Sequence, residues 1–513
     1  PRRLDDIVAC LQFAAEQGLS VHPRGAGTGV AGESLGRGII LDLSAHFRTI
    51  REIGAEDVVV EPGVVVGQLN RVLARSGRQF GPDPAHVDVS TMGGVVSRNG
   101  SGSRFLRYGA ARDQLRAVQI VLADGSVHRF SRHTLRPLEP STGGMWAQRV
   151  AELVRRHPEA LETYRPEVPS SGAGYALAET VGDDAVDLAK LIAGSEGTLG
   201  VLVELRLATH ALPACQGVAL LFFRRFHEAA QVAGEVPLAG LSACDLLDRR
   251  LLDLAAQETA TYGKWIPPGT EALLLLEAVG ATRAEVAGAL QAAMSSGIPE
   301  SCLAGPTRVS LEPHDVAEAW RLAKHIVARL ARLTGTTRPV PFIEDVAVPR
   351  NRLASFLADA RQLLRGSGLI ASFYSHAGHG QVHVRPFLDL QHPGHRTLMP
   401  RLARAFFDAV LASGGRISTE HAWGLSRSWY LKERLPALHR LWCDVKELFD
   451  PLRLLNPGKL GDPDPPPLTA HLRGAESARR AAAPAPAGTP ASGEANHVVG
   501  ASDKEPTLSS GRA

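Results

Sequence analysis

The stretch from Ser375 to Pro386 contains the residues whose types and spacing best suit catalysis. Closely spaced glycines and a proline disfavour a helix there, so the stretch is predicted to be a strand. A flat strand would point His376 and His383 to opposite faces, because successive side chains alternate. Gly378 and Gly380 permit a bulge or kink that brings the two imidazoles together. Converging imidazoles with a nearby carboxylate are typical of a divalent metal site.

A second interpretation of this stretch is a buried strand whose histidines are satisfied by hydrogen bonds. Farther along the chain, Glu420 and His421 offer a carboxylate and an imidazole side by side. Such a pair alone is typical of an exposed polar surface. These residues by themselves leave both interpretations open.

Three glycine-rich segments precede this stretch, in the first 209 residues. In Arg24–Glu33 alternate glycines let backbone N–H groups point the same way, which suits a pyrophosphate. The loop lacks the Gly-Lys-Ser/Thr ending of a Walker loop and the strand-to-helix setting of the dinucleotide fingerprint. Ser90–Ser103 is small and rich in hydroxyls, and Gly194–Gly200 leads into the apolar run that begins at Val201. Each segment taken alone also fits an ordinary turn.

The elements expected to position these segments follow from hydrophobic periodicity and turn residues. Helices are predicted over residues 3–18, 66–76, 353–364 and 438–449. Strands are predicted over residues 38–43, 57–63, 115–124, 201–205, 272–277 and 341–349. Beyond Asp462 the chain is rich in Pro, Ala, Ser and Gly, and it is predicted to be disordered.

Composition limits the classes of function. The 513 residues suffice for about three domains of roughly 150 residues. Lys+Arg 56 against Asp+Glu 53 gives a formal charge of +3, and this gives no reason to expect nucleic acid or an acidic membrane surface. The five scattered cysteines form no CxxC pair, which indicates a reducing compartment, hence the cytoplasm. No apolar segment reaches the ~18 residues of a membrane span.

Together and in this order, the glycine-rich segments resemble the FAD-binding domain of the vanillyl-alcohol oxidase/PCMH superfamily. The resemblance implies that the first loop cradles the FAD pyrophosphate while the others line the dinucleotide. It implies non-covalent FAD, because Thr28 stands where some members attach flavin through a histidine. The cofactor-binding residues that it implies are Arg24, Gly25, Ala26, Gly27, Thr28, Gly29, Thr91, Gly94, Ser97, Asn99, Ser101, Tyr108, Gly109, Glu196, Gly197, Gly200 and Val201.

Four later motifs resemble one group within that superfamily, the glycolate oxidase flavin subunit and the D-lactate and D-2-hydroxyglutarate dehydrogenases. These motifs are Phe342–Pro349, His376–His383, Ser418–His421 and Asn456–Lys459.

The resemblance implies that His376, His383 and Glu420 bind a divalent metal, zinc or manganese, that His421 is the catalytic base, and that Asn456 lies near the flavin ring. An ion on the substrate hydroxyl would lower its pKa, so that a base removes the proton while hydride leaves the α-carbon for flavin N5.

The sequence departs from the pattern of that group at several positions. His379 replaces the usual Asp between the two glycines, and Ala422 replaces the Gly after the Glu-His pair. Ala323 stands where an arginine often holds the substrate carboxylate. Arg321 or Lys324 is the predicted substitute, although a lysine does not reproduce a bidentate arginine clamp.

The stretch His383–Leu390 further resembles a long-chain subgroup fused to a C-terminal iron–sulfur domain. No cysteine follows Cys443, so that domain is expected to be absent here. Either a separate iron–sulfur or other electron-acceptor protein is expected as a partner, or the chain is truncated. The start at Pro1 is also expected to be incomplete. A partner could hold the protein at a membrane surface.

The predicted fold class is α+β, with a PCMH-type FAD-binding domain (1–209), a substrate or cap domain (210–405), a C-terminal helical segment that returns to the flavin site (406–462) and a tail (463–513). The predicted function is FAD-dependent oxidation of a small D-2-hydroxy acid. One alternative is a flavin-binding subunit or degenerate homologue without dehydrogenase activity. Another is a non-redox flavoenzyme that resembles alkyl-glycerone-phosphate synthase.

Overall fold

The computed structural model describes residues 1–135, 141–169, 172–295 and 297–472. The greater part of the predicted tail, residues 473–513, lies outside the described residues. Residues 463–472 form turns, and Leu468 and Leu472 pack against the hydrophobic core. The described chain therefore continues past the position where the tail was expected to begin.

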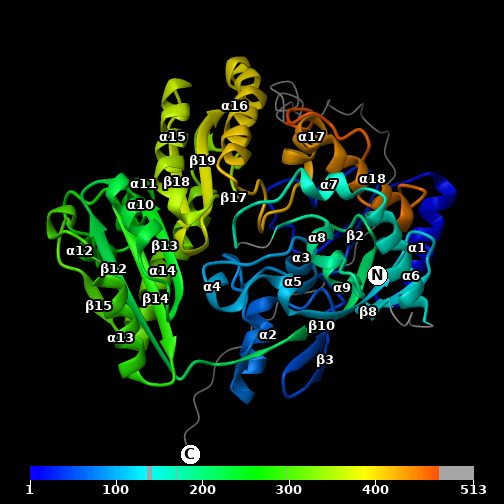
Figure 1. The fold of residues 1–513 in the computed structure, drawn as a ribbon, viewed down its shortest axis with the longest axis horizontal. Helices are drawn as coiled ribbons and strands as arrows, with labels where there is room; N and C mark the ends of the chain where they lie inside the picture. The colour runs from blue at the N-terminus through cyan, green and yellow to red at the C-terminus, as the bar shows by residue number, and fades with distance from the viewer. Residues whose placement is uncertain (136–140, 170–171, 296, 473–513) are drawn as a thin grey trace, which may run out of the picture. The chain divides into compact units, whose positions relative to one another are not determined.

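The first half of the chain is built on a five-stranded sheet in the order β3-β4-β10-β6-β7. Two of its strands, β3 and β10, are labelled in Figure 1. Its neighbouring strands are antiparallel, and an Asp124-Gly125 turn joins β6 to β7 with Gly125 at φ 82°. The strand bounds are β3 Ile50–Ile53, β4 Asp57–Val60, β6 Leu115–Val121, β7 Val127–Phe130 and β10 Val201–Ala208.

Three two-stranded sheets accompany it: β1 (Val21–Arg24) with β2 (Ile39–Asp42), β5 (Arg78–Gln79) with β11 (His210–Ala211), and β8 (Arg132–Thr134) with β9 (Ala185–Asp187). The first of these pairs is parallel. The helices here are α1 Leu4–Gln17, α2 Val66–Leu73, α3 Met92–Ser97, α4 Phe105–Tyr108, α5 Ala111–Gln114, α6 Thr142–Arg155, α7 Pro158–Glu162, α8 Leu177–Thr180 and α9 Leu188–Ile192.

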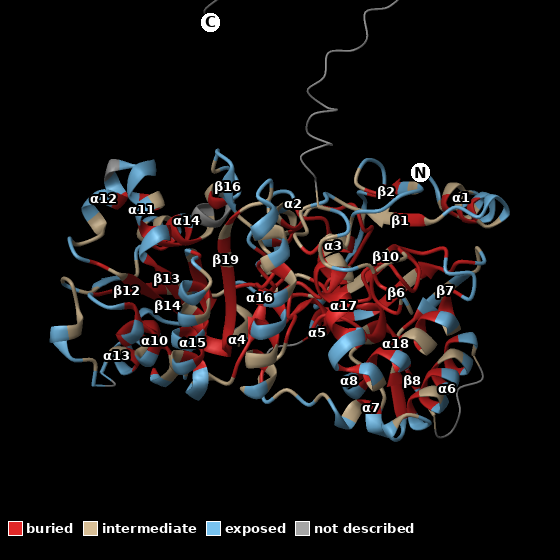
Figure 2. Cartoon of the chain, turned by 90° about the horizontal axis from the view of Figure 1, so that it is seen from above, coloured by how far each residue is buried: buried red, intermediate tan, exposed pale blue. Residues whose placement is uncertain are grey.

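The second half contains an eight-stranded sheet in the order β15-β12-β14-β13-β18-β19-β16, and β17 also pairs with β19. Its central strands are buried on both faces, which explains the continuous apolar runs in the sequence (Figure 2). The strand bounds are β12 Cys215–Phe223, β13 Leu241–Asp248, β14 Ala272–Gly280, β15 Arg308–Ser310, β16 Thr337–Pro339, β17 Val346–Ala347, β18 Ala371–His376 and β19 Gln381–Asp389.

Helices cover both faces of this sheet. Leu274 and Leu276 point to one face, in the same apolar cluster as α10 (Phe226–Glu235), α13 (Arg283–Met294) and α15 (Leu353–Gly366). Leu273 and Leu275 point to the other face, with α11 (Arg249–Glu258), α12 (Ala260–Trp265) and α14 (Pro313–Leu330). Mixed helices and mainly antiparallel sheets confirm the predicted α+β class.

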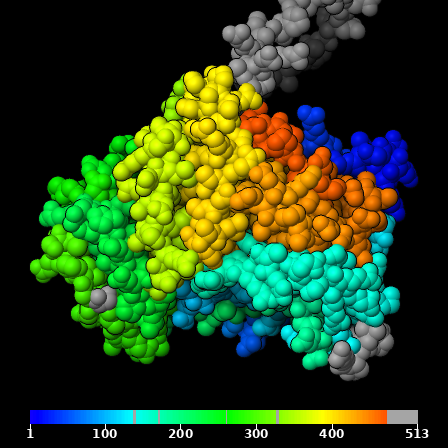
Figure 3. All heavy atoms as spheres, turned by 45° about the horizontal axis from the view of Figure 1, so that its top comes forward, coloured from blue at the N-terminus to red at the C-terminus, as the bar shows by residue number. Residues whose placement is uncertain are grey.

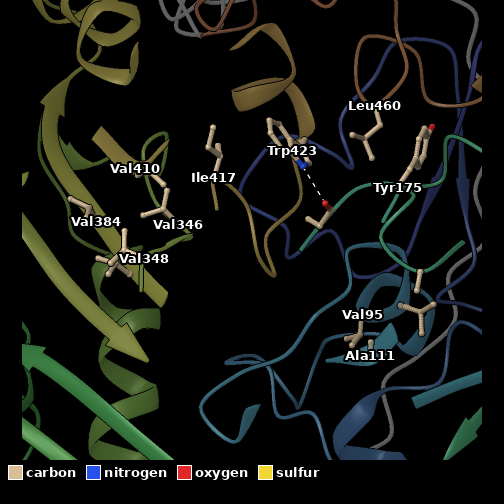
Figure 4. Close-up of a cluster of buried hydrophobic side chains, with 14 of the residues drawn as sticks. Val95, Ala111, Tyr175, Val346, Val348, Val384, Val410, Ile417, Trp423 and Leu460 are labelled. Carbon is tan, nitrogen blue, oxygen red and sulfur yellow. Dashed lines mark hydrogen bonds between the residues drawn. The ribbon is translucent and has the colours of Figure 1, made fainter. Parts of the chain in front are cut away.

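The C-terminal helices α16 (Pro393–Ala412), α17 (Gly424–Arg434) and α18 (Pro436–Phe449) bring the chain back to the first half. In Figure 3 the orange C-terminal segment lies against the cyan segment that contains α6 and α7. Helix α18 contacts both α6 and α7. Trp423 is buried in the shared core, where its indole N–H donates to the Ala173 carbonyl at 3.3 Å (Figure 4). Residue 405, the expected domain boundary, lies inside α16, and the division into domains stays a prediction.

Two expected strands differ in the structure. The stretch 375–386 is a hairpin of β18 and β19 joined by a 3₁₀ turn, Ala377–His379, and not one kinked strand. Gly380 follows that turn at φ 76°, and a Cβ there would lie 1.9 Å from the Val348 carbonyl oxygen. The expected strand 341–349 is reduced to β17, because Asp345 adopts φ 60° and breaks the extended backbone.

Candidate active site

The structure brings the three residues predicted as metal ligands into one buried group. In the hairpin, Tyr374 pairs with His383 and His376 with Gln381, so the two histidines share one face. Their Nε2 atoms lie 3.7 Å (His376) and 3.4 Å (His383) from Oε1 of Glu420. The candidate ligand atoms all lie within 4.8 Å of one another, a geometry that fits one divalent ion.

A buried carboxylate orients the imidazole of His376. Asp245 Oδ1 lies 2.9 Å from Nδ1 of His376, which leaves Nε2 facing Glu420. Burial disfavours the protonated ring, but Asp245 and Glu420 outweigh burial and raise the pKa of His376 to about 10. The site therefore favours a positive charge at this position, whether a proton or a metal ion.

Glu420 is fixed from the first half of the chain. The backbone N–H and the hydroxyl of Ser101 donate to Oε2 of Glu420 at 3.2 and 3.1 Å, and Oε1 is left for the histidines. Burial raises the pKa of this carboxyl, but hydrogen bonds from His376 and His383 outweigh it and hold the pKa well below its usual range. Glu420 is therefore an anion in this site.

His421, the predicted base, is paired with a buried glutamate. Its Nδ1 lies 2.7 Å from Oε1 of Glu344. The other oxygen of Glu344, Oε2, accepts a hydrogen bond from Arg385 at 3.2 Å. Burial raises the pKa of Glu344, but His421 and Arg385 outweigh it and hold the pKa far below the usual value. A carboxylate on Nδ1 favours the tautomer whose Nε2 is free to accept a proton.

Asp345 stabilises the loop that contains Glu420 and His421. Its carboxylate accepts the backbone N–H groups of Thr419 at 3.0 Å, Glu420 at 3.1 Å and His421 at 2.9 Å. It also accepts from the side chains of Ser418, Thr419 and Gln381. One buried side chain thus ties the loop to the β18–β19 hairpin.

A cavity beside this centre is lined by the first glycine-rich loop and is called here the glycine-lined cavity. Within the described chain, the backbone N–H groups of residues 25–30 form no hydrogen bond. A run of free N–H groups beside Arg24 suits an anionic phosphate group. The predicted cofactor residues that line the cavity are Arg24, Gly25, Ala26, Gly27, Thr28, Gly29, Thr91, Gly94, Ser97, Glu196, Gly197 and Gly200.

Six predicted cofactor residues do not line this cavity. Ser101 holds Glu420, as described above, and Asn99 bonds to the Gly172 carbonyl and the Arg112 N–H. Tyr108 accepts from Gln79, and Gly109 turns the chain at φ 67°. Val201 is in the apolar core, and Asn456 donates to the Glu196 carbonyl.

Glu196 joins the cavity wall to the segment that follows His421. Its carboxyl accepts the N–H groups of Trp423 at 2.7 Å and Gly424 at 2.9 Å. Burial raises the pKa of Glu196 to about 8, and the neighbouring Glu33 adds to the effect. This carboxyl is therefore largely neutral near pH 7, so it does not repel an anionic ligand.

A second cavity, called here the histidine-lined cavity, adjoins the first, and Thr28 and Arg98 line both. His376, His383, Glu420 and His421 are on its wall. Of the two predicted substrate residues, Lys324 lines it and pairs with Asp83 at 2.7 Å. The structure does not bring Arg321 to it: that side chain is half exposed and pairs with Glu318 at 2.5 Å.

Several residues of the site were not singled out from the sequence. Asp245 is the one charged residue of the buried strand β13 before its last residue, Asp248, and a charge in a buried strand is a usable signal. Glu344 and Asp345 are adjacent acids in an apolar run, and that signal was assigned to a strand. Arg98 and Arg385 carry no comparable signal.

Two family models match the chain. A FAD binding domain covers residues 1–131, and the C-terminal domain of FAD linked oxidases covers residues 212–460. D-2-hydroxyglutarate dehydrogenase of Pseudomonas putida is 30% identical over 495 residues, covering 90% of this chain and 48% of that protein. Glycolate oxidase subunit GlcD of Bacillus subtilis is 28% identical over 476 residues, covering 90% of this chain and 87% of that protein.

Among solved structures, 4-ethylphenol oxidase from Gulosibacter chungangensis, in complex with isoeugenol, has the same fold. The TM-score is 0.60 at 18% identity, over 90% of this chain and 88% of that one.

A glycine-lined cavity beside a histidine–carboxylate centre fits a chain that contains a FAD binding domain. The chain belongs to the FAD-linked oxidases of the vanillyl-alcohol oxidase/PCMH superfamily, which confirms the predicted resemblance. It spans about half the length of the D-2-hydroxyglutarate dehydrogenase that it matches. In the described part of the chain, no helix is long and apolar enough to cross a membrane.

Proposed function

We propose that this protein oxidises a small D-2-hydroxy acid to the 2-oxo acid, with non-covalently bound FAD and a divalent metal, zinc or manganese. The observation that carries the proposal is the junction of two sites. The His376, His383 and Glu420 group and His421 line one cavity, and that cavity adjoins the cavity of the FAD-binding domain. The names of the two relatives support the same substrate class.

The residues present fit both groups. Free N–H groups of residues 25–30 and Arg24 suit the FAD pyrophosphate, and Thr28 offers no imidazole for covalent attachment. FAD, when bound, supplies a two-electron acceptor for hydride from the α-carbon of the substrate. A divalent ion held by His376, His383 and Glu420 supplies a Lewis acid that lowers the pKa of the substrate hydroxyl.

His421 performs the proton transfer in this proposal. Its Nε2 accepts the hydroxyl proton, and Glu344 at Nδ1 stabilises the imidazolium that forms. The oxidation is balanced because the α-carbon loses a hydride, the hydroxyl loses a proton, and a C=O double bond forms. Asp345 keeps His421 in place through the loop amides.

Steady-state oxidation of D- and L-2-hydroxy acids with a dye as electron acceptor tests the proposal. We expect turnover with a D-acid and a loss of about 100-fold or more in kcat for His421→Ala, with flavin content unchanged. His314→Ala is the matched control, because His314 is an exposed histidine remote from the cavity lining. A flavin-containing protein that turns over no acid would favour the alternative, a flavin-binding subunit without dehydrogenase activity.

Metal analysis tests the ion separately. Purified protein is expected to hold about one zinc or manganese ion per chain, and His383→Ala and Glu420→Ala are expected to lose it. Retention of a full equivalent in both variants would contradict this ligand set. Exposed His314→Ala again serves as the control.

A separate electron-acceptor protein, iron–sulfur or other, belongs to the same proposal, as does a location in the cytoplasm or at a membrane surface through that partner. Co-purification from the native source, followed by iron analysis and cell fractionation, tests both.

A further inference from the structure

Arg98 is a buried arginine at the junction of the two cavities. It exposes only 9% of its surface and lines both the glycine-lined and the histidine-lined cavity. In the described part of the chain, its guanidinium forms no ion pair and no hydrogen bond. A buried guanidinium without a protein partner is costly, so its donors call for an anionic ligand.

The other cationic side chains of the histidine-lined cavity are already neutralised. Lys324 pairs with Asp83 at 2.7 Å, and Arg385 donates to Glu344 at 3.2 Å. Arg98 is therefore the cationic side chain on this wall, among the described residues, that has no carboxylate partner. The positive charge of Arg98 also affects His86, another residue of this wall. Burial lowers the pKa of His86, and Arg98, Arg385 and His421 lower it further.

The backbone holds Arg98 firmly in this position. Arg98 follows the last residue of α3, and its N–H donates to the Gly94 carbonyl at 3.3 Å. The next residue, Asn99, turns at φ 57° and is fixed by bonds to the Gly172 carbonyl and the Arg112 N–H. A Cβ at position 100 would lie 3.2 Å from Cγ1 of Val95 and 3.4 Å from Nε of Arg98, so Gly100 lies directly against both side chains.

The expected carboxylate clamp on α14 is not available. Ala323, which occupies that position, is fully buried in the apolar cluster with Trp320 and does not line the cavity. Arg321 on the same helix pairs with Glu318 outside the cavity. A substrate carboxylate must therefore find its counter-charge on another element.

We propose, on the basis of the function proposed above, that Arg98 binds the carboxylate of the 2-hydroxy acid and that this acid has one carboxylate and an apolar side chain. A planar guanidinium matches a carboxylate with two parallel hydrogen bonds. A second carboxylate would have to break the Lys324–Asp83 or Arg385–Glu344 pair. The wall also carries apolar side chains, from Val30, Pro84, Ala85, Leu251 and Leu330, beside uncharged polar ones such as Ser372 and Tyr374.

Anaerobic flavin reduction and steady-state kinetics of Arg98→Met and Arg98→Lys test the role of Arg98. Both variants are expected to raise KM for the D-acid about 10- to 100-fold, with a smaller effect on kcat. With the amide of the same acid, which carries no charge, wild type and variants are expected to differ little. Arg107→Met is the control, because Arg107 lines neither cavity.

Two results would overturn the role of Arg98. One is an unchanged KM for the acid in Arg98→Met. The other is an equal loss for acid and amide, which would mean a structural defect. If the first result comes with a shift of the flavin reduction potential, it assigns Arg98 to the flavin.

The substrate class is tested with pairs of D-acids. D-2-hydroxyisocaproate is expected to exceed D-2-hydroxyglutarate and D-malate in kcat/KM by about 10-fold or more, because each unmatched buried carboxylate costs at least that factor. A dicarboxylate as the best substrate would contradict the inference.

Binding without turnover separates this inference from the proposed function. The corresponding 2-oxo acid is titrated into oxidised protein, and the flavin absorbance reports its binding. Binding that Arg98→Met abolishes, in a protein that oxidises no acid, would retain the carboxylate site and reject the function. Turnover with an unaffected Arg98→Met would retain the function and reject the site.

Discussion

Glu344 and Asp345 are neighbours in the sequence but support different parts of the site. Glu344 contacts His421 and Arg385, whereas Asp345 accepts the amides of the loop that carries His421. The positive φ of Asp345 turns the chain between them, so that successive carboxylates point in different directions. Glu344 contacts the imidazole of His421, and Asp345 holds the backbone of His421 in position.

The variant Glu344→Gln tests the role of the first acid. An amide does not stabilise an imidazolium as a carboxylate does, so we expect kcat to fall at least about tenfold while flavin content is retained. Steady-state kinetics and the flavin spectrum measure both quantities. Glu433→Gln, which removes a surface pair with Arg404, is the control. Equal kcat in both variants would contradict a role for Glu344 in proton transfer.

Residue types were enough to select the candidate metal ligands, but not the other charged residues of the site. His376, His383 and Glu420 could be named from their chemistry and their motif. Asp245 is marked by its charge in an apolar strand, but its contact with His376 could not be predicted, because it depends on which strands are neighbours in the sheet. Arg98 could not be predicted either, because its lack of a partner becomes visible only when every other charge has been placed.

At the scale of elements, the β18–β19 hairpin shows what periodicity can and cannot predict. The convergence of two histidines was predicted, but the mechanism was wrong: a turn that contains Gly378 and ends at Gly380 reverses the chain. The alternation rule holds within each strand and fails across a turn. On α14, Arg321 is exposed, whereas Lys324, about one helical turn later, lines the cavity. Side-chain type alone does not predict which of the two faces the cavity.

The N-terminus of α11 yields a prediction about pH. Asp248 caps this helix through the Leu251 N–H and also accepts the Phe373 N–H of β18. Burial raises the pKa of Asp248 from 3.8 to about 6 in the folded protein. A carboxyl with a raised folded pKa contributes stability that is fully present below the unfolded pKa and is lost as pH rises through the folded value.

Wild type is therefore expected to lose about 1.5 kcal/mol of unfolding free energy relative to Asp248→Asn between about pH 5 and about pH 7.5. Urea denaturation of both proteins at the two pH values measures the difference. The absolute stability of the variant does not matter, because only the change with pH is compared. Parallel pH profiles would contradict the raised pKa.

At the scale of the whole described chain, a buried ion network joins residues from the two halves. Arg104, next to α4, donates two hydrogen bonds to Glu277 on β14, each at 2.8 Å. Trp320 and Ser242 also donate to this carboxylate. Arg104 lies 3.7 Å from Asp83, whose other partner is Lys324 at the histidine-lined cavity. The network therefore connects the second sheet to the cavity wall.

The variant Glu277→Gln is expected to lower the free energy of unfolding by about 3 kcal/mol, because it leaves Arg104 buried with a weaker partner. Urea denaturation measures this loss. Glu312→Gln breaks an exposed pair with Arg283 and is expected to cost less than about 1 kcal/mol. Equal losses in the two variants would contradict a structural role for the buried network.

The sequence was sufficient for the fold class and for the order of the glycine-rich segments, because these follow from local patterns. It was not sufficient for contacts such as Ser101 with Glu420, which join residues far apart in the chain. Residue 405 was a natural boundary by composition, yet it lies within one continuous helix, α16. Long-range pairing decides such features, and a single sequence carries little information about it.

The most direct test of the central claim is an anaerobic visible spectrum of the purified protein during addition of a D-2-hydroxy acid. The claim is that the histidine-lined cavity transfers hydride from a D-2-hydroxy acid to FAD with the help of a metal ion. We predict that one D-acid bleaches the oxidised flavin band, that its L-enantiomer does not, and that prior removal of metal by a chelator abolishes the bleaching. A flavin band that no acid in the panel bleaches, with metal present, would contradict the account.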